Sequence, residues 1–165
     1  KGTLFTGTIE SNLRYAKEDA TEEELAKAAE IAQALEFIEE KPERYETAIT
    51  QGGTNVSGGQ RQRLSIARAL VKKPEIYIFD DTFSALDFKT DAKLRKALNI
   101  LCQETKSTVL LVAQRISSIM HAERIVVLDK GEVVGIGNHE ELMKSCEVYQ
   151  EIAYSQLSKE ELGNE

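Results

Sequence analysis

Apolar and polar positions follow two different spacings along this chain. Four mainly apolar runs, at residues 75–79, 108–113, 124–128 and 132–136, are flanked by segments in which apolar residues recur every three or four positions. The recurrent spacing predicts amphipathic helices, and a continuous apolar run between helices is typical of a strand that is buried on both faces. Strands that alternate with helices predict a layered α/β fold.

Polar residues mark where several of these helices begin. Thr21 and Glu24 have the spacing of a capping box, in which each side chain accepts a hydrogen bond from the other residue's backbone N–H. We expect the helix that follows to continue through residues 35–40 and to break at Pro42, because proline cannot complete the helical hydrogen bonds. Further helices are expected at residues 91–102, from the cap pair Asn138 and Glu141 toward Cys146, and at residues 147–157, before a polar tail at residues 158–165.

The segment at residues 56–70 combines several features of a phosphate-binding helix start. Ser57 is a favoured N-cap residue, and Gly58 and Gly59 have no Cβ, so a ligand can approach their backbone closely. The helix that follows directs its free N–H groups and the positive end of its dipole toward this point. Three apolar residues of that helix share a face that we expect to be buried, namely Leu64, Ala67 and Val71.

Two acids, Asp80 and Asp81, directly follow the apolar run at residues 75–79. Ligands of open α/β sheets bind at the carboxyl ends of the strands, and carboxylates are good ligands for Mg²⁺. Taken alone, the pair is better explained as the start of a solvated turn. Its meaning therefore depends on the neighbouring motifs.

Length and charge limit the classes of protein to which this chain can belong. The 165 residues are enough for a domain with a substantial core, and 41% hydrophobic residues with 30% charged residues are typical of a globular protein. A net charge of -7 argues against a nucleic-acid partner, because such proteins carry basic patches that neutralise phosphates. No apolar stretch is long enough to span a bilayer.

The order of these motifs resembles the ATP-binding cassette (ABC) family. Residues 57–60 resemble its signature motif, Asp80 its Walker B motif and residues 84–87 its D-loop. The resemblance implies an α/β fold, with a P-loop NTPase-like (RecA-like) parallel-sheet core and the ABC α-helical subdomain. It also implies ATP and Mg²⁺ as cofactors and ATP hydrolysis as the reaction.

The same resemblance implies a division of the chain. Residues 1–74 match the helical subdomain with the signature motif, and residues 75–157 match the later half of the RecA-like core. The sequence contains no Gly-x-x-x-x-Gly-Lys-[Ser/Thr] P-loop. We therefore expect the P-loop strand, the upstream half of the core and a transmembrane domain to lie outside this chain, and the chain alone to be inactive toward ATP.

The resemblance assigns a role to each candidate site residue. Asp80 matches the position that holds the metal, and Asp81 and Gln114 match two catalytic positions. The residues that match nucleotide-binding positions are Ser57, Gly58, Gly59, Gln60 and Asp87.

The two catalytic positions depart from the family pattern. Asp81 stands where most members carry the Glu that polarises the attacking water, and its carboxylate is set back by about 1.5 Å. Since a misplacement of about 1 Å can cost about a hundredfold in rate, this change is expected to slow hydrolysis. Gln114 stands where the family has a His that contacts the γ-phosphate; its amide can donate a hydrogen bond but cannot become cationic. Both departures resemble the degenerate half of heterodimeric exporters, whose own site hydrolyses ATP poorly while its signature motif completes the partner's site in trans.

Further segments resemble ABC exporters in particular. Residues 4–12 resemble the segment after the exporter Q-loop, and residues 50–54 resemble the X-loop, with Gln51 in place of the usual Glu. The implied partners are a second nucleotide-binding domain, in a different chain, and the coupling helices of the transmembrane domains, with no nucleic acid. The implied location is the cytoplasmic face of a bacterial cell membrane.

Two alternatives remain open at this point. A soluble ABC-family ATPase that acts in DNA repair or translation control would require basic patches or coiled-coil arms, which the sequence lacks. A non-catalytic subunit that senses nucleotide would fit Asp81 and Gln114, and it is compatible with the exporter.

Overall fold

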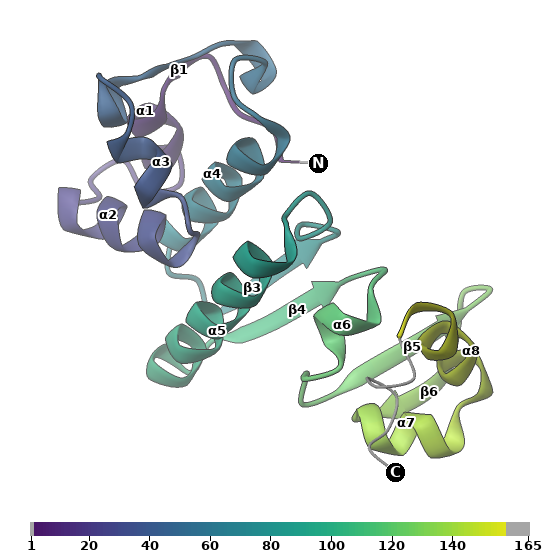
Figure 1. The fold of residues 1–165 in the computed structure, drawn as a ribbon. Coiled ribbons are helices and arrows are strands. Elements are labelled where there is room, and N and C mark those ends of the chain that lie inside the picture. Colours follow the sequence, from purple (N-terminus) through teal and green to yellow (C-terminus); the bar gives the residue numbers. More distant parts are fainter. Residues whose placement is uncertain (1, 158–165) are drawn as a thin grey trace. The chain divides into compact units, whose positions relative to one another are not determined.

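The computed structural model describes residues 2–157 and divides into two compact units, Lys1–Val112 and Ala113–Glu165 (Figure 1). Each unit has its own apolar core. The predicted polar tail at residues 158–165 lies outside the described residues. The predicted domain division at residue 74 falls inside the first unit and stays a prediction.

The first unit holds most of the helices and two small sheets. Its elements are, in order, β1 (Gly7–Thr8), α1 (Ile9–Arg14), α2 (Glu22–Ile31), α3 (Leu35–Glu39), η1 (Arg44–Glu46), β2 (Ala48–Ile49), η2 (Gln51–Gly53), α4 (Gly58–Val71), β3 (Ile76–Asp80), α5 (Phe88–Thr105) and β4 (Thr108–Val112). The second unit contains α6 (Ile116–Ile119), β5 (Ile125–Asp129), β6 (Glu132–Gly137), α7 (His139–Ser145) and α8 (Glu147–Gln156). Within residues 2–157, no helix combines the length and the apolar composition that crossing a membrane requires.

Helix α4 organises the helical part of the first unit. It packs against α1 and α2, and Leu64, Ala67 and Val71 are completely buried, at 0% exposure each. The predicted buried face of this helix is therefore confirmed. Its position fixes the place of its first turn, which carries the Gly-rich motif.

Reciprocal capping boxes begin α2 and α7, as predicted. The Thr21 side chain accepts a hydrogen bond from the Glu24 N–H, and the Glu24 carboxylate accepts one from the Thr21 N–H. Asn138 and Glu141 make the equivalent pair of bonds. Each box satisfies two N–H groups that a helix start would otherwise leave without partners.

The predicted helix at residues 35–40 is present as α3, which ends before Pro42, but the prediction that it continues α2 is wrong. A turn at Gln33, whose φ is 57°, separates the two helices. Ala32 and Ala34 are both fully buried, and residues two positions apart cannot share one face of a helix. The chain therefore leaves the helix at this point and buries both methyl groups.

Helix α5 is longer than the helix predicted at residues 91–102. It begins directly after Asp87, whose carboxylate accepts a hydrogen bond from the Thr90 N–H at 2.9 Å. It ends before Lys106, which adopts a left-handed conformation with a φ of 56°. Apolar spacing identified only the central turns of the helix, because its first and last turns are mainly polar.

The β3–β4 sheet is parallel, with Ile78 opposite Leu110, and one of its faces is exposed. Tyr77 and Phe79, each 3% exposed, belong to the same core as α5. Ile76 and Ile78 on the other face are 57% and 69% exposed. The prediction that these strands are buried on both faces is wrong for the described residues, because a helix covers only one side of the sheet.

The second unit is a β-hairpin with two helices packed on it. Strands β5 and β6 are antiparallel and join at Lys130 and Gly131, whose φ angles of 50° and 86° suit a type I′ turn. Helix α7 packs against β6 and α8 against β5, and the core contains Ile125, Val127 and the fully buried Tyr149.

Neighbouring residues of β3 on opposite faces provide a matched test of this one-sided burial. We expect Phe79→Ala to lower the free energy of unfolding by about 3 to 5 kcal/mol, because it leaves a cavity in the core. We expect Ile78→Ala to change it by about 1 kcal/mol or less, since the Ile78 side chain is exposed. Urea denaturation of the 165-residue chain measures both values. Equal losses would mean that both faces of β3 are covered in solution.

Glu24 links three parts of the first unit through its carboxylate. It accepts hydrogen bonds from Lys17 Nζ at 2.7 Å, from Lys73 Nζ at 2.6 Å and from the Thr21 N–H at 3.2 Å. The two lysine bonds, followed by the backbone bond, lower the pKa of Glu24 from 4.5 to about 2. A carboxyl group with a lower pKa in the folded state stabilises the fold above its unfolded pKa and loses this effect as the pH falls through its folded pKa.

We therefore expect Glu24→Gln to lower the urea midpoint at pH 7 and to have little effect near pH 2. The difference between the variant and the parent chain should shrink between pH 4.5 and pH 2, where Glu24 becomes protonated. Glu30→Gln, on an exposed position of the same helix, is the control for a lost negative charge. A difference that does not depend on pH would contradict the assignment to the ionised carboxylate.

Candidate functional site

The first turn of α4 is held by a reciprocal cap. The Ser57 hydroxyl accepts a hydrogen bond from the Gln60 backbone N–H at 3.1 Å, and the Gln60 side-chain oxygen Oε1 accepts one from the Ser57 N–H at 3.1 Å. The predicted N-cap role of Ser57 is confirmed. The matching role of Gln60 was missed, although the Ser-x-x-Gln spacing is a capping-box signal.

Gly58 and Gly59 leave the end of α4 accessible. A Cβ added at Gly58 would meet no atom within 4 Å, whereas one at Gly59 would lie 3.5 Å from the backbone oxygen of Ala85. The Gly-rich turn therefore faces open space at Gly58 and lies beside the segment at residues 84–87 at Gly59. A 14-residue helix that begins with an open turn presents its free N–H groups and the positive end of its dipole to an anion.

Asp80 and Asp81 lie at the carboxyl end of β3, where they were predicted. Both are exposed, and the Asp81 N–H donates to the Val112 oxygen at 2.9 Å, next to the last paired residues of β3 and β4. Asp81 has a φ of 47°, a left-handed conformation in which Asp is better tolerated than most residues. Strained backbone of this kind often occurs at functional sites, and no local sequence signal revealed it.

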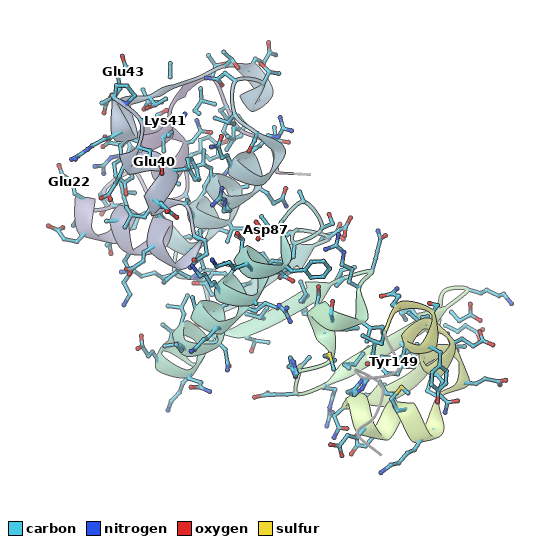
Figure 2. All side chains as sticks on the ribbon, in the orientation of Figure 1. Glu22, Glu40, Lys41, Glu43, Asp87 and Tyr149 are labelled. Atoms are coloured by element: carbon cyan, nitrogen blue, oxygen red, sulfur yellow. The ribbon has the colours of Figure 1, made fainter. Side chains whose placement is uncertain are left out.

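Asp87 has a structural role as the cap of α5, which begins beside the D-loop-like segment (Figure 2). Its carboxylate accepts hydrogen bonds from the Thr90 N–H at 2.9 Å and from the Thr90 hydroxyl at 2.7 Å. These bonds, the backbone one first, lower the pKa of Asp87. Asp87 is therefore a fixed negative charge at neutral pH.

Arg63 was not among the predicted site residues, yet it links the signature helix to its surroundings. Its Nη1 donates to the Gln33 oxygen at 2.7 Å, its Nε donates to the Gly59 oxygen at 3.4 Å, and its guanidinium lies 4.8 Å from the Phe37 ring centroid. Burial lowers the pKa of Arg63, and the charge of Asp87 opposes this effect. The four-residue spacing from Gly59, which puts both on one helix face, was the available signal.

Gln114 belongs to the second unit, where it is exposed. Its backbone oxygen accepts a hydrogen bond from Gln156 Nε2 at 2.8 Å, and Gln156 Oε1 accepts one from the Ile116 N–H at 2.9 Å. The side chain of His139, in contrast, contacts the buried Tyr149, with 2.8 Å between Nδ1 and the hydroxyl oxygen (Figure 2). His139 is thus a packing residue.

The donor set at Asp80 fits a magnesium ion that takes most of its ligands from a nucleotide. Within the described part of the chain, no three His, Cys, Asp or Glu side chains gather in a group that could hold a metal ion. Mg²⁺ on nucleotides commonly uses one or two carboxylates together with phosphate oxygens and water. The exposed Asp80 carboxylate at the end of a strand meets that requirement.

Comparisons with known proteins identify the family to which this chain is similar. The family described as ABC transporter matches residues 3–84. An ABC transporter ATP-binding protein of Mycobacterium tuberculosis is 44% identical over 163 residues, which cover 97% of this chain and 27% of that protein. The ATP-dependent lipid A-core flippase of Desulfotalea psychrophila is 48% identical over 147 residues, which cover 89% of this chain and 25% of the flippase. This chain therefore spans about a quarter of the length of these relatives.

A solved structure extends the similarity to the fold. A bacterial Atm1-family ABC exporter with ATP bound superimposes with a TM-score of 0.91 at 34% sequence identity, covering 96% of this chain and 28% of the exporter chain. The predicted α/β fold class and the predicted family are both confirmed. This chain belongs to the ATP-binding domains of ABC transporters.

Proposed function

We propose that this chain is part of an ATPase domain that couples ATP binding and hydrolysis to export across a membrane. The observation that carries the proposal is the open, capped start of α4, where Gly58 faces free space and Gly59 lies beside Ala85. In a dimer of nucleotide-binding domains, residues 57–60 would contact the γ-phosphate of ATP bound to the second domain. Backbone N–H groups in a fixed turn suit this task, because they stabilise an anion without having to reorganise.

The remaining predicted residues have roles at the chain's own nucleotide site under this proposal. Asp80 would hold Mg²⁺, which neutralises charge on the phosphates, and Gln114 would donate a hydrogen bond from its amide to a γ-phosphate oxygen. Asp87 would add a fixed negative charge at the D-loop. In this arrangement, residues 1–74 act as the helical subdomain and residues 75–157 as the later half of the core.

The chain's own site is proposed to bind ATP but to hydrolyse it slowly. Asp81 has a shorter side chain than the Glu of the family, and its left-handed backbone restricts where the carboxylate can point. Gln114 cannot carry the positive charge of a protonated histidine. The second domain is therefore proposed to be a different chain with a competent site, completed by the signature motif of this one.

Two features of the first unit support docking onto transmembrane coupling helices. Phe5 and Tyr15 are 44% and 71% exposed, and their ring centroids lie 4.6 Å apart. The Arg68 guanidinium lies 5.1 Å from the Phe5 ring and donates a hydrogen bond to the Thr3 oxygen at 2.7 Å, which holds the pair in place. Exposed aromatic side chains on a fixed support are typical of protein contact sites. Gln51, in the segment that resembles the X-loop, is proposed as a further contact with the coupling helices. Docked in this way, the chain would lie at the cytoplasmic face of the membrane. The chain alone is proposed to be inactive toward ATP, because its sequence contains no P-loop motif.

Gly58→Glu tests the role of the signature motif. In the full-length subunit assembled with its partner, we expect ATP turnover to fall by at least about a hundredfold, because a carboxylate would occupy the proposed phosphate position. A Cβ at this position meets no atom within 4 Å, so the fold should be retained. The charge-matched control Gln103→Glu, at an exposed position of α5, should keep turnover within about twofold of the parent. Retained turnover in Gly58→Glu would reject the proposed contact.

Asp81→Glu combined with Gln114→His tests the proposed weakness of the chain's own site. We expect total ATP turnover of the assembled transporter to rise, with hydrolysis at the own site increasing about tenfold or more. The left-handed backbone at residue 81 opposes the longer side chain, so the gain should be smaller than a fully restored site would give. Nucleotide trapped at each site by orthovanadate reports where hydrolysis occurs. Unchanged turnover would instead favour a subunit that senses nucleotide without hydrolysing it.

A further inference from the structure

One glutamine side chain spans the backbone around Gln114. The amide of Gln156, the last residue of α8, donates from Nε2 to the Gln114 oxygen at 2.8 Å and accepts at Oε1 from the Ile116 N–H at 2.9 Å. A carboxamide is suited to this geometry because it carries a donor and an acceptor side by side. Reversing the amide would place nitrogen against N–H and oxygen against carbonyl, so the two bonds fix its orientation.

The bond to Ile116 supplies a cap that α6 otherwise lacks. Ile116 is the first residue of α6, and the N-cap residue Arg115 makes no side-chain capping bond. An N–H in the first turn of a helix has no partner within the helix. Gln156, forty residues along the chain, therefore accepts the hydrogen bond of an N–H that the helix itself leaves without a partner.

Helix α8 provides a fixed support for Gln156. Tyr149 and Ala153, on the same helix, are 1% and 0% exposed, and Leu157 directly after Gln156 is also buried. A side chain on a well-packed helix loses less entropy on bonding than one on a mobile loop. The position of the Gln114 backbone is thus tied to the core of the second unit rather than to its immediate neighbours in sequence.

We propose that Gln156 is a positioning residue for Gln114, holding the backbone at residues 114–116 so that the Gln114 amide meets the γ-phosphate of ATP. The inference rests on the proposed role of Gln114 at the chain's own site. It assigns to the end of α8 an influence on nucleotide recognition that none of the predicted motifs includes. Because a histidine at position 114 has the same backbone oxygen, the contact does not depend on which side chain stands there.

The affinity of this chain's own nucleotide site for ATP relative to ADP measures the positioning role of Gln156. ATP and ADP, each with Mg²⁺, are titrated into the full-length subunit assembled with its partner. This chain carries Gly58→Glu throughout, so that its signature motif no longer completes the partner's site. We expect Gln156→Leu to lower the ATP-to-ADP affinity ratio by about twofold to tenfold, the equivalent of one or two lost neutral hydrogen bonds. Gln156→Glu, which keeps the acceptor for Ile116 and loses the donor to Gln114, should lower it as well. Gln150→Leu is the control, since Gln150 lies on the same helix and donates instead to the Met143 oxygen.

A double-mutant cycle with Gln114→Ala separates positioning from a general effect on the fold. If Gln156 acts through Gln114, adding Gln156→Leu to Gln114→Ala will lower the affinity ratio no further. The inference would be overturned if Gln156→Leu lowered the affinity ratio equally in the parent and in Gln114→Ala. It would also be overturned if Gln114→Ala lowered the ratio and Gln156→Leu left it unchanged. If Gln114→Ala itself leaves the ratio unchanged, or the site binds neither nucleotide, the proposed function of Gln114 fails and the inference fails with it.

Discussion

The burial of one face of α4 is the interaction on which the first unit depends. Leu64, Ala67 and Val71 have no exposed surface, and full burial of a Leu or Val side chain contributes about 1.5 to 3 kcal/mol. The helix is fixed along its length by these contacts with α1 and α2. Its first turn is therefore fixed as well, and the Ser57 cap presents the open backbone at Gly58 in a constant position. The proposed phosphate site, built on this packed helix, would need little reorganisation when its ligand arrives.

Polar links and backbone strain surround the same end of α4. Arg63 connects the signature turn to the α2–α3 turn and stacks on Phe37, and Gly59 approaches the backbone of Ala85. Asp81, four residues before Ala85, has a left-handed backbone that the bond from its N–H to Val112 helps to maintain. Packing of the first unit thus stabilises conformations that the isolated segments would not adopt.

The two proposed catalytic residues belong to different units, and each is held by a different means. Asp81 is positioned by the pairing of β3 and β4, whereas the backbone of Gln114 is bonded by a side chain from α8. An Asp in place of Glu and a Gln in place of His both weaken acid–base and electrostatic chemistry without removing hydrogen-bonding capacity. This combination is the basis of the proposal that the chain's own site retains nucleotide and turns it over slowly.

Features that depend on nearby residues could be predicted from the sequence. The capping boxes at Thr21 and Asn138, the buried face of α4 and the Lys130–Gly131 turn each follow from residues within a few positions of one another. The family followed from the order of short motifs, and with it the identity of the candidate site residues. Local patterns suffice here because hydrogen bonds at helix ends and helical periodicity are themselves local.

Other features were decided only by the tertiary structure. Which face of β3 is covered depends on where α5 packs. The sequence of an apolar run does not distinguish a strand with one buried face from a strand with two. The turn at Gln33 exists because Ala32 and Ala34 must both reach the core, and Arg63, thirty residues away, bonds its carbonyl oxygen. The contact of Gln156 with residues 114 and 116 joins positions about forty residues apart. Such contacts form only when the folded chain brings distant segments together, so no local pattern in the sequence encodes them.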